Sequence, residues 1–147
     1  MLLNINVELS APLFPVLCLG RRELRDMARR ILETLGYRDA AVNLVITDDY
    51  YMQYLNTAFL FCPGPTNVLA FEEEAGREAG FLGEVFISAQ ALKRESVLYG
   101  QPVFVHFVRL LAHGIQHLAG LEHGPAMDDW SLHLQNTIKA QEYGLYA

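Results

Sequence analysis

VFVHFVRLLAHGIQHLAGLEH, residues 103–123, contains a helical segment that is apolar on nearly every side. Pro102 suits the first turn of such a helix, because its missing N–H is not needed there. Gly120 suits the end of the helix, because glycine readily adopts the left-handed backbone that turns the chain. A helix without a polar face is usually buried. We therefore predict a central helix over residues 102–118, around which the other elements pack.

Three histidines lie in the second half of this stretch, at positions 113, 117 and 123. Residues four apart share one face of a helix, so His113 and His117 direct two imidazoles toward one point. The turn at Gly120 allows His123 to return as a third ligand. Three imidazoles with a vacant fourth position are typical of a catalytic zinc site. We expect one Zn²⁺ at the end of the central helix, with Ni²⁺ as another candidate.

Hydrophobic patterning predicts the order β-α-β-α-β-β-α-α-α for the whole chain. Alternating or short apolar runs predict four strands, at residues 3–9, 41–46, 68–71 and 83–87. Besides the central helix, helical spacing predicts helices at residues 21–35, 50–59, 89–99 and from after 125 to about 143. Asp48 and Ser88 are the expected N-caps of two of them. This order indicates an α/β (α+β) fold, a single domain over residues 1–147 with a mixed four-stranded sheet and about five helices.

Composition limits the function classes. The net charge of −6 argues against non-specific binding of nucleic acid by the whole surface, although five arginines gather between residues 21 and 30. Cys18 and Cys62 lie far apart and suggest a reducing compartment. Residues 1–10 lack the pattern of a signal peptide, and the apolar run 11–19 is too short to span a bilayer. We expect a cytoplasmic protein without a membrane partner.

The histidine spacing equals that of the metzincin motif H-E-x-x-H-x-x-G-x-x-H. In those proteases the glutamate after the first histidine is the general base, and here that position holds Gly114. A peptidase mechanism therefore lacks its base at the usual place. A metallopeptidase-like hydrolase remains an alternative, but a minor one.

The histidine segment closely resembles the YbeY family of bacterial metal-dependent endoribonucleases, whose signature is H-G-x-L-H-L-x-G-[YF]-D-H. Residues 55–71 are similar to the family's L-N-x-x-[YF]-R-x-K-x-x-P-T-[DN]-V-L-S-F, and residues 82–88 to its L-G-D-[IV]-x-I-S. The resemblance implies a mixed sheet packed with helices and a metal at one end of a cleft. It also implies cleavage of single-stranded RNA in ribosomal RNA maturation and ribosome quality control. Ribosomal RNA and the ribosome or its associated proteins would then be the partners.

The resemblance assigns roles to individual residues. The three metal ligands are His113, His117 and His123. Thr66 and Asn67 would line the cleft, unless they only satisfy local backbone groups.

Two carboxylates match aspartates of the family motifs. Glu122, beside a ligand, is the first candidate for a general base or an orienting group, and Glu84 is a second catalytic candidate. Each can instead be a solvent-facing or structural carboxylate.

The chain departs from the family pattern near the expected cleft. The family arginine, which is thought to hold the RNA phosphate, falls on Leu60, and the lysine two positions later falls on Cys62. The leucine before the second histidine is Gln116. Arg22 and Arg25, on the polar side of the first predicted helix, could offset the lost charge by attracting RNA, or could form an ordinary solvated face.

Two alternatives to the nuclease stay open. One is a metal-dependent hydrolase of another substrate. The other is a ribosome-associated module whose metal is structural and whose nuclease activity is weak or absent. The sequence leaves the oligomeric state open.

Overall fold

The computed structural model describes residues 3–64, 66–75, 79–121 and 124–145. The predicted order of strands and helices is confirmed. The elements are β1 (Asn4–Leu9), α1 (Arg21–Thr34), β2 (Ala41–Thr47), α2 (Asp49–Leu60), β3 (Val68–Glu72), β4 (Phe81–Ser88), α3 (Ala89–Tyr99), α4 (Val103–Leu118), α5 (Pro125–Thr137) and a 3₁₀ turn at Ala140–Tyr143.

The four strands form one mixed sheet in the order β1-β2-β4-β3. β1, β2 and β4 run parallel, and β3 pairs antiparallel with β4 at the edge. Parallel neighbours need a crossover on a sheet face, and α1 supplies the one between β1 and β2. The predicted mixed four-stranded sheet with five helices is confirmed.

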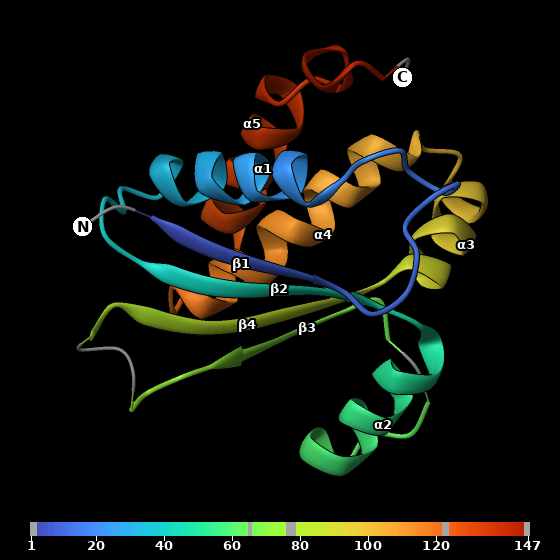
Figure 1. The fold of residues 1–147 in the computed structure, drawn as a ribbon, viewed down its shortest axis with the longest axis horizontal. Coiled ribbons are helices and arrows are strands. Elements are labelled where there is room, and N and C mark those ends of the chain that lie inside the picture. Colours follow the sequence, from blue (N-terminus) through green and yellow to red (C-terminus); the bar gives the residue numbers. More distant parts are fainter. Residues whose placement is uncertain (1–2, 65, 76–78, 122–123, 146–147) are drawn as a thin grey trace.

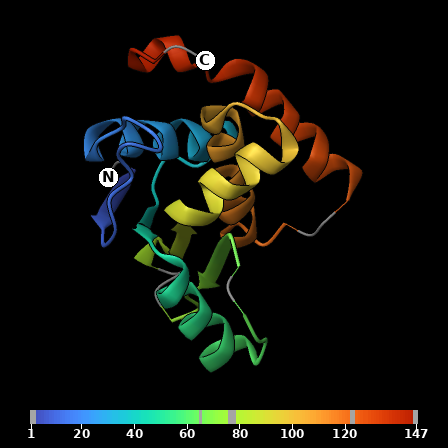
Figure 2. The same cartoon turned by 90° about the vertical axis from the view of Figure 1, so that its right-hand side faces the viewer.

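The helices are divided unequally between the two faces of the sheet. α1 and α4 cover one face, α5 lies outside α4, and α2 lies on the opposite face near one end of the sheet (Figures 1 and 2). The face under α1 and α4 contributes Leu44, Val85 and Ile87 to the main core. The other face forms a small cluster in which Val45, Leu69 and Phe86 meet α2.

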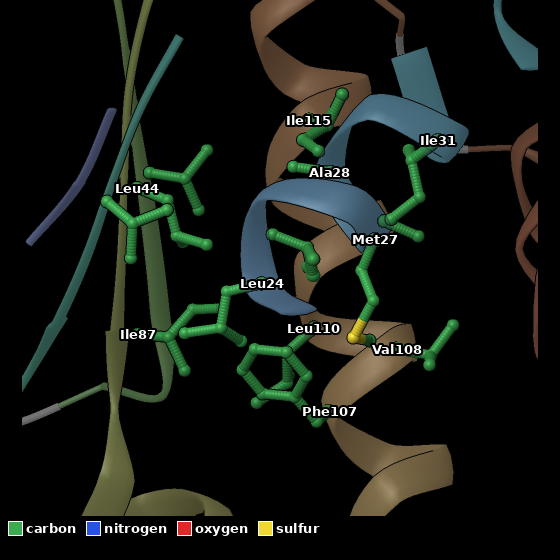
Figure 3. Packing of buried hydrophobic residues seen from close by; sticks show 14 of the residues in the cluster. Leu24, Met27, Ala28, Ile31, Leu44, Ile87, Phe107, Val108, Leu110 and Ile115 are labelled. Carbon is green, nitrogen blue, oxygen red and sulfur yellow. The ribbon is translucent and has the colours of Figure 1, made fainter. Parts of the chain in front are cut away.

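Helix α4 is the centre of the main core, as its apolar sequence predicts. Phe107, Val108 and Leu111 are fully buried, and Figure 3 shows residues of α4 meeting α1 and the sheet. Burial of each such side chain contributes about 1.5–3 kcal/mol of transfer free energy. The helix that bears the candidate metal ligands is thus the most firmly packed one.

The expected N-caps are confirmed: Asp48 Oδ1 accepts from the Tyr51 N–H at 2.9 Å, and Ser88 Oγ accepts from the Ala91 N–H at 3.1 Å. The last helix differs from its prediction. α5 ends at Thr137, because Ile138 adopts an extended backbone before the 3₁₀ turn. This break lets Tyr143 return to α1, where its hydroxyl donates to Asp26 at 2.8 Å. Within the described residues, no helix has the length and apolarity needed to cross a bilayer.

Candidate metal centre and groove

His113 and His117 converge at the C-terminal end of α4. Their Nε2 atoms are 3.1 Å apart, their ring centroids are 4.7 Å apart, and the rings are inclined by 79°. Both side chains are half-buried, so the pair is reachable from one side. The predicted orientation of two imidazoles toward one point is what the helix produces.

This spacing fits a shared metal ion. Two nitrogens on one tetrahedral zinc, each about 2.05 Å from the metal, would lie about 3.3 Å apart. The pair therefore needs little movement to act as two ligands. The third predicted ligand, His123, and its neighbour Glu122 lie outside the described residues. Among the residues that are described, no cluster of three or more metal-binding side chains occurs.

Gly114, between the two histidines, is required by packing. A Cβ built on it would lie 2.6 Å from Val85 Cγ1 and 3.3 Å from Val68 Cγ2. The close approach of α4 to β4 and β3 therefore leaves no room for a side chain. A glutamate at this position, as in the metzincin motif, would be incompatible with this fold.

The end of α4 is closed as the sequence predicts. Gly120 has φ +80°, its N–H donates to the His117 carbonyl at 3.0 Å, and the Leu121 N–H donates to the Gln116 carbonyl at 3.1 Å. These two bonds form a Schellman motif. The chain thus turns at Gly120, three residues after the second histidine.

Gln116 is fully buried and joins α4 to α5. Its Nε2 donates to the Met127 carbonyl at 3.2 Å, and its Oε1 accepts from Ser131 Oγ at 3.3 Å. The departure from the family's leucine is therefore compensated by partners on α5. These bonds also anchor α5 beside the segment that follows α4.

A polar groove of about 730 Å³ has His113 in its wall. Its walls come from the segment before β3, from α4 and from α5, and they include Thr66, Asn67, Arg109, His113 and Asp128. The volume is within the range of small-molecule sites. The structure thus places Thr66 and Asn67 in the same groove as His113.

The Asn67 side chain is already engaged in the protein. Its amide donates to Glu95 Oε1 at 3.0 Å, and the same oxygen lies 2.8 Å from His106 Nε2. Its Oδ1 accepts from the Val68 N–H at 2.7 Å. Asn67 thus shapes the groove by joining the strand edge to α3 and α4. His106, fully buried, is the core residue that its position two turns before His113 indicates.

Glu84 is not brought to the histidine pair. It sits between Asn43 and Phe71 in the register of the sheet, while its neighbour Val85 faces Gly114 on α4. Side chains alternate along a strand, so Glu84 belongs to the opposite face. It is therefore absent from the groove, away from the place where its expected catalytic role would put it.

Arg22 and Arg25 line a different groove, formed by β1, α1 and the 3₁₀ turn. Tyr143, in the same groove, has its pKa raised to about 12 by partial burial and by its hydrogen bond to Asp26. Partial burial would raise the pKa of Asp26, but hydrogen bonds from Tyr143 and Arg29 outweigh it, and the pKa is lowered. This arginine surface is thus separate from the histidine groove.

Two charged residues of the groove, Arg109 and Asp128, cannot be identified as site residues from the sequence alone. Arg109 lies in the apolar pattern of α4 and is easily taken for a chance interruption of a core helix. Asp128 lies in the first turn of α5, where an acidic residue is common for helix stability. A spacing of four residues between Arg109 and His113 is the only sequence signal, because it places both on one helix face.

Comparison with known proteins connects this site to a family. The family model described as Endoribonuclease YbeY matches residues 19–141. A protein of that name from Oleidesulfovibrio alaskensis is 39% identical over 132 residues, covering 76% of this chain and 78% of the relative. Another from Geobacter metallireducens is 37% identical over 109 residues, covering 71% of this chain and 73% of the relative.

The fold is also found among solved structures. The solution structure of TM1509 from Thermotoga maritima superposes with a TM-score of 0.66 at 19% identity, covering 95% of this chain and 92% of that one. The fold and the site define an α+β domain with a histidine pair at the end of its central helix, beside a polar groove. The chain belongs to the Endoribonuclease YbeY family. It is accordingly a hydrolase of RNA phosphodiester bonds, and the expectation of a nuclease in ribosomal RNA processing is confirmed.

Proposed function

We propose that this protein is a metal-dependent endoribonuclease that cleaves single-stranded RNA during ribosomal RNA maturation and ribosome quality control. The observation that carries this proposal is the convergence of His113 Nε2 and His117 Nε2, 3.1 Å apart, with His113 also in the wall of a polar groove. His123 is the proposed third ligand of a Zn²⁺ ion.

A bound zinc ion would supply a Lewis acid and activate water for attack on phosphorus. The protein's own part is to bind and orient RNA in the groove. Thr66 lines that groove and is half-buried, so its hydroxyl is available to the substrate. Asn67 holds the shape of the same wall through Glu95. Glu122, next to a proposed ligand, is the proposed proton acceptor or orienting group.

A cytoplasmic location and a ribosomal partner complete the proposal. Cys18 and Cys62 are both free and exposed, which suits a reducing compartment. Ribosomal RNA presents single-stranded loops and ends, the class of RNA whose backbone and bases are open to a groove. Ribosome-associated proteins would bring the enzyme to such segments.

Cleavage of a labelled single-stranded RNA tests the proposed function. We expect cleavage by the wild type, loss with EDTA, recovery with Zn²⁺ and weak cleavage of a duplex of the same sequence. The rate should fall by about 100-fold or more in His117→Ala. His133→Ala, which removes an exposed histidine of α5, is the matched control and should retain the rate. A folded, metal-loaded wild type that cleaves no RNA would overturn the nuclease and favour the ribosome-associated module.

The role of Arg22 and Arg25 in attracting RNA needs its own test. Both are exposed, whereas Arg30 is paired with Glu142 at 3.0 Å. Reversal of both to Glu should weaken RNA binding. It should also reduce the slope of the logarithm of the binding constant against the logarithm of the salt concentration by about 0.7 per lost phosphate contact. Lys93→Glu with Lys139→Glu changes the net charge equally elsewhere and serves as control. If the two double variants behave alike, the arginines form an ordinary solvated face.

A further inference from the structure

Arg109 shares the groove with His113, one of the candidate metal ligands. It lies on α4 four residues before His113, about 6 Å along the helix axis and on the same face. The segment with Thr66 and Asn67 forms the adjoining wall. A cation about one helical turn from His113 can meet one phosphate of a strand while a neighbouring phosphate lies at the histidine pair.

Arg109 differs from the other described arginines, which are either exposed or held in an ion pair. Among the exposed ones are Arg21, Arg22, Arg25 and Arg38. Arg29 is paired with Asp26 and Glu33, Arg30 with Glu142, and Arg94 with Asp49. Arg109 is half-buried, and no residue in the described part of the chain forms an ion pair with it. Partial burial of a charge without a counter-charge is unfavourable. An anion entering the groove would supply that counter-charge.

The other described residues of the groove supply no second arginine or lysine that could bind an anion. Among the described residues that line the groove, Arg109 is the only cation and Asp128 the only carboxylate, and these two do not form an ion pair. Gln101, Ser131 and Gln135 add neutral hydrogen-bonding groups. Leu60 is 46% exposed on α2 and is not part of the groove. Within the part of the chain that the structure describes, Arg109 is therefore the guanidinium that a phosphate beside His113 can meet.

We propose that Arg109 binds a phosphate of the RNA backbone and thereby positions the strand at the histidine pair. This role rests on the proposed function, and it supplies from α4 the cation that is missing at Leu60. The planar guanidinium suits it, because two N–H groups can donate to two phosphate oxygens at once. Arg109 is a substrate-positioning residue, and it has no part in moving protons.

RNA binding without metal tests this role separately from catalysis. The probe is a fluorescein-labelled single-stranded RNA, and its anisotropy is measured with EDTA present, so that no cleavage is needed. Arg109→Gln should weaken binding about tenfold and lower the salt slope by about 0.7, because one charge-assisted pair is lost. Arg109→Lys should recover part of the affinity, since lysine keeps the positive charge but lacks the planar pair of N–H donors.

Two matched variants make the experiment decisive. Arg38→Gln removes one exposed cation outside the groove and should leave the affinity unchanged. Asp128→Asn removes the groove carboxylate and should tighten binding, because it lessens repulsion of phosphate. Circular dichroism and thermal unfolding of each variant check that the fold is kept. In the zinc-loaded enzyme, Arg109→Gln should raise KM more than it lowers kcat.

The outcomes separate this inference from the nuclease proposal. A loss of RNA affinity in Arg109→Gln, with Arg38→Gln unchanged, supports the inference even if the wild type cleaves nothing. Equal affinities of Arg109→Gln, Arg38→Gln and wild type would overturn it, even if the enzyme cleaves RNA. Weaker binding in Asp128→Asn would also contradict it, because the groove would then favour positive charge.

Discussion

At the scale of single residues, local chemistry decides much of the site. Two helices begin where a capping side chain predicts, at Asp48 and Ser88. The central helix ends where the backbone freedom of glycine predicts, at Gly120. Their partners lie within a few residues, so sequence alone is sufficient. The chain of contacts from Asn67 through Glu95 to His106 could not be found in this way. It joins residues 28 and 11 positions apart, and only the packing of the segment before β3, α3 and α4 brings them together.

Gly114 gives a prediction at this scale. Gly114→Ala would place a methyl group against Val85 and should destabilise the fold by about 1–3 kcal/mol, because the core is already filled. Urea unfolding of the metal-free protein measures the change. In a Val85→Ala background the same substitution should cost less, because the clashing Cγ1 is gone. Equal costs in the two backgrounds would refute the packing explanation.

Glu95 gives a second residue-scale prediction. Its Oε1 is the partner of both Asn67 Nδ2 and the buried His106 Nε2. Glu95→Ala should lower the free energy of unfolding by about 1–3 kcal/mol, because it leaves a buried nitrogen without a partner. Lys93→Ala, at an exposed position of the same helix, is the control. An unfolding midpoint no lower than that of the control would mean that the network contributes nothing to stability.

At the scale of elements, α4 joins the core to the site. Its apolar sides could be predicted from the sequence, as could the convergence of His113 and His117, because both follow from helical periodicity. Arg109 could not be assigned a role, since its importance depends on the wall that the Thr66 segment and α5 build opposite it. The end of α5 at Thr137 could not be predicted from the sequence either. It depends on the contact of Tyr143 with α1, more than a hundred residues away.

The attachment of α5 to α4 can be tested through Gln116. Gln116→Leu restores the family pattern, but it removes both hydrogen bonds to α5. We expect the free energy of unfolding to change by less than about 1.5 kcal/mol, because leucine regains apolar burial while the Met127 carbonyl loses its donor. Hydrogen exchange at the first turns of α5 should nevertheless become faster than in the wild type. Unchanged exchange there would show that Gln116 does not anchor the helix.

At the scale of the whole molecule, the chain closes on itself where the 3₁₀ turn meets α1. Tyr143 donates to Asp26 and accepts from Arg30, which also pairs with Glu142. The family match, from residue 19 to 141, includes the α1 side of this contact and ends just before Glu142 and Tyr143. The contact therefore ties the last part of the chain to the helix that bears Arg22 and Arg25.

This contact predicts a dependence of stability on alkaline pH. The pKa of Tyr143 is raised to about 12 in the folded protein, against about 10 in an unfolded chain. The unfolded state therefore loses its proton first, so the stabilisation is complete below about pH 10 and is lost as the pH rises toward 12. Urea midpoints at pH 8 and pH 11 should show the difference between wild type and Tyr143→Phe shrinking. Tyr50→Phe, at a side chain 84% exposed, is the control. A constant difference would contradict the assignment.

The central claim is that one metal ion at His113, His117 and His123 makes this protein an RNA-cleaving enzyme. Titration of metal-free protein with Zn²⁺, with cleavage of labelled single-stranded RNA as the readout, tests it most directly. We predict that the rate rises with added Zn²⁺, levels off at one equivalent per chain and stays at baseline in His113→Ala. Full-rate cleavage by the metal-free protein, or the same plateau in His113→Ala, would contradict the claim.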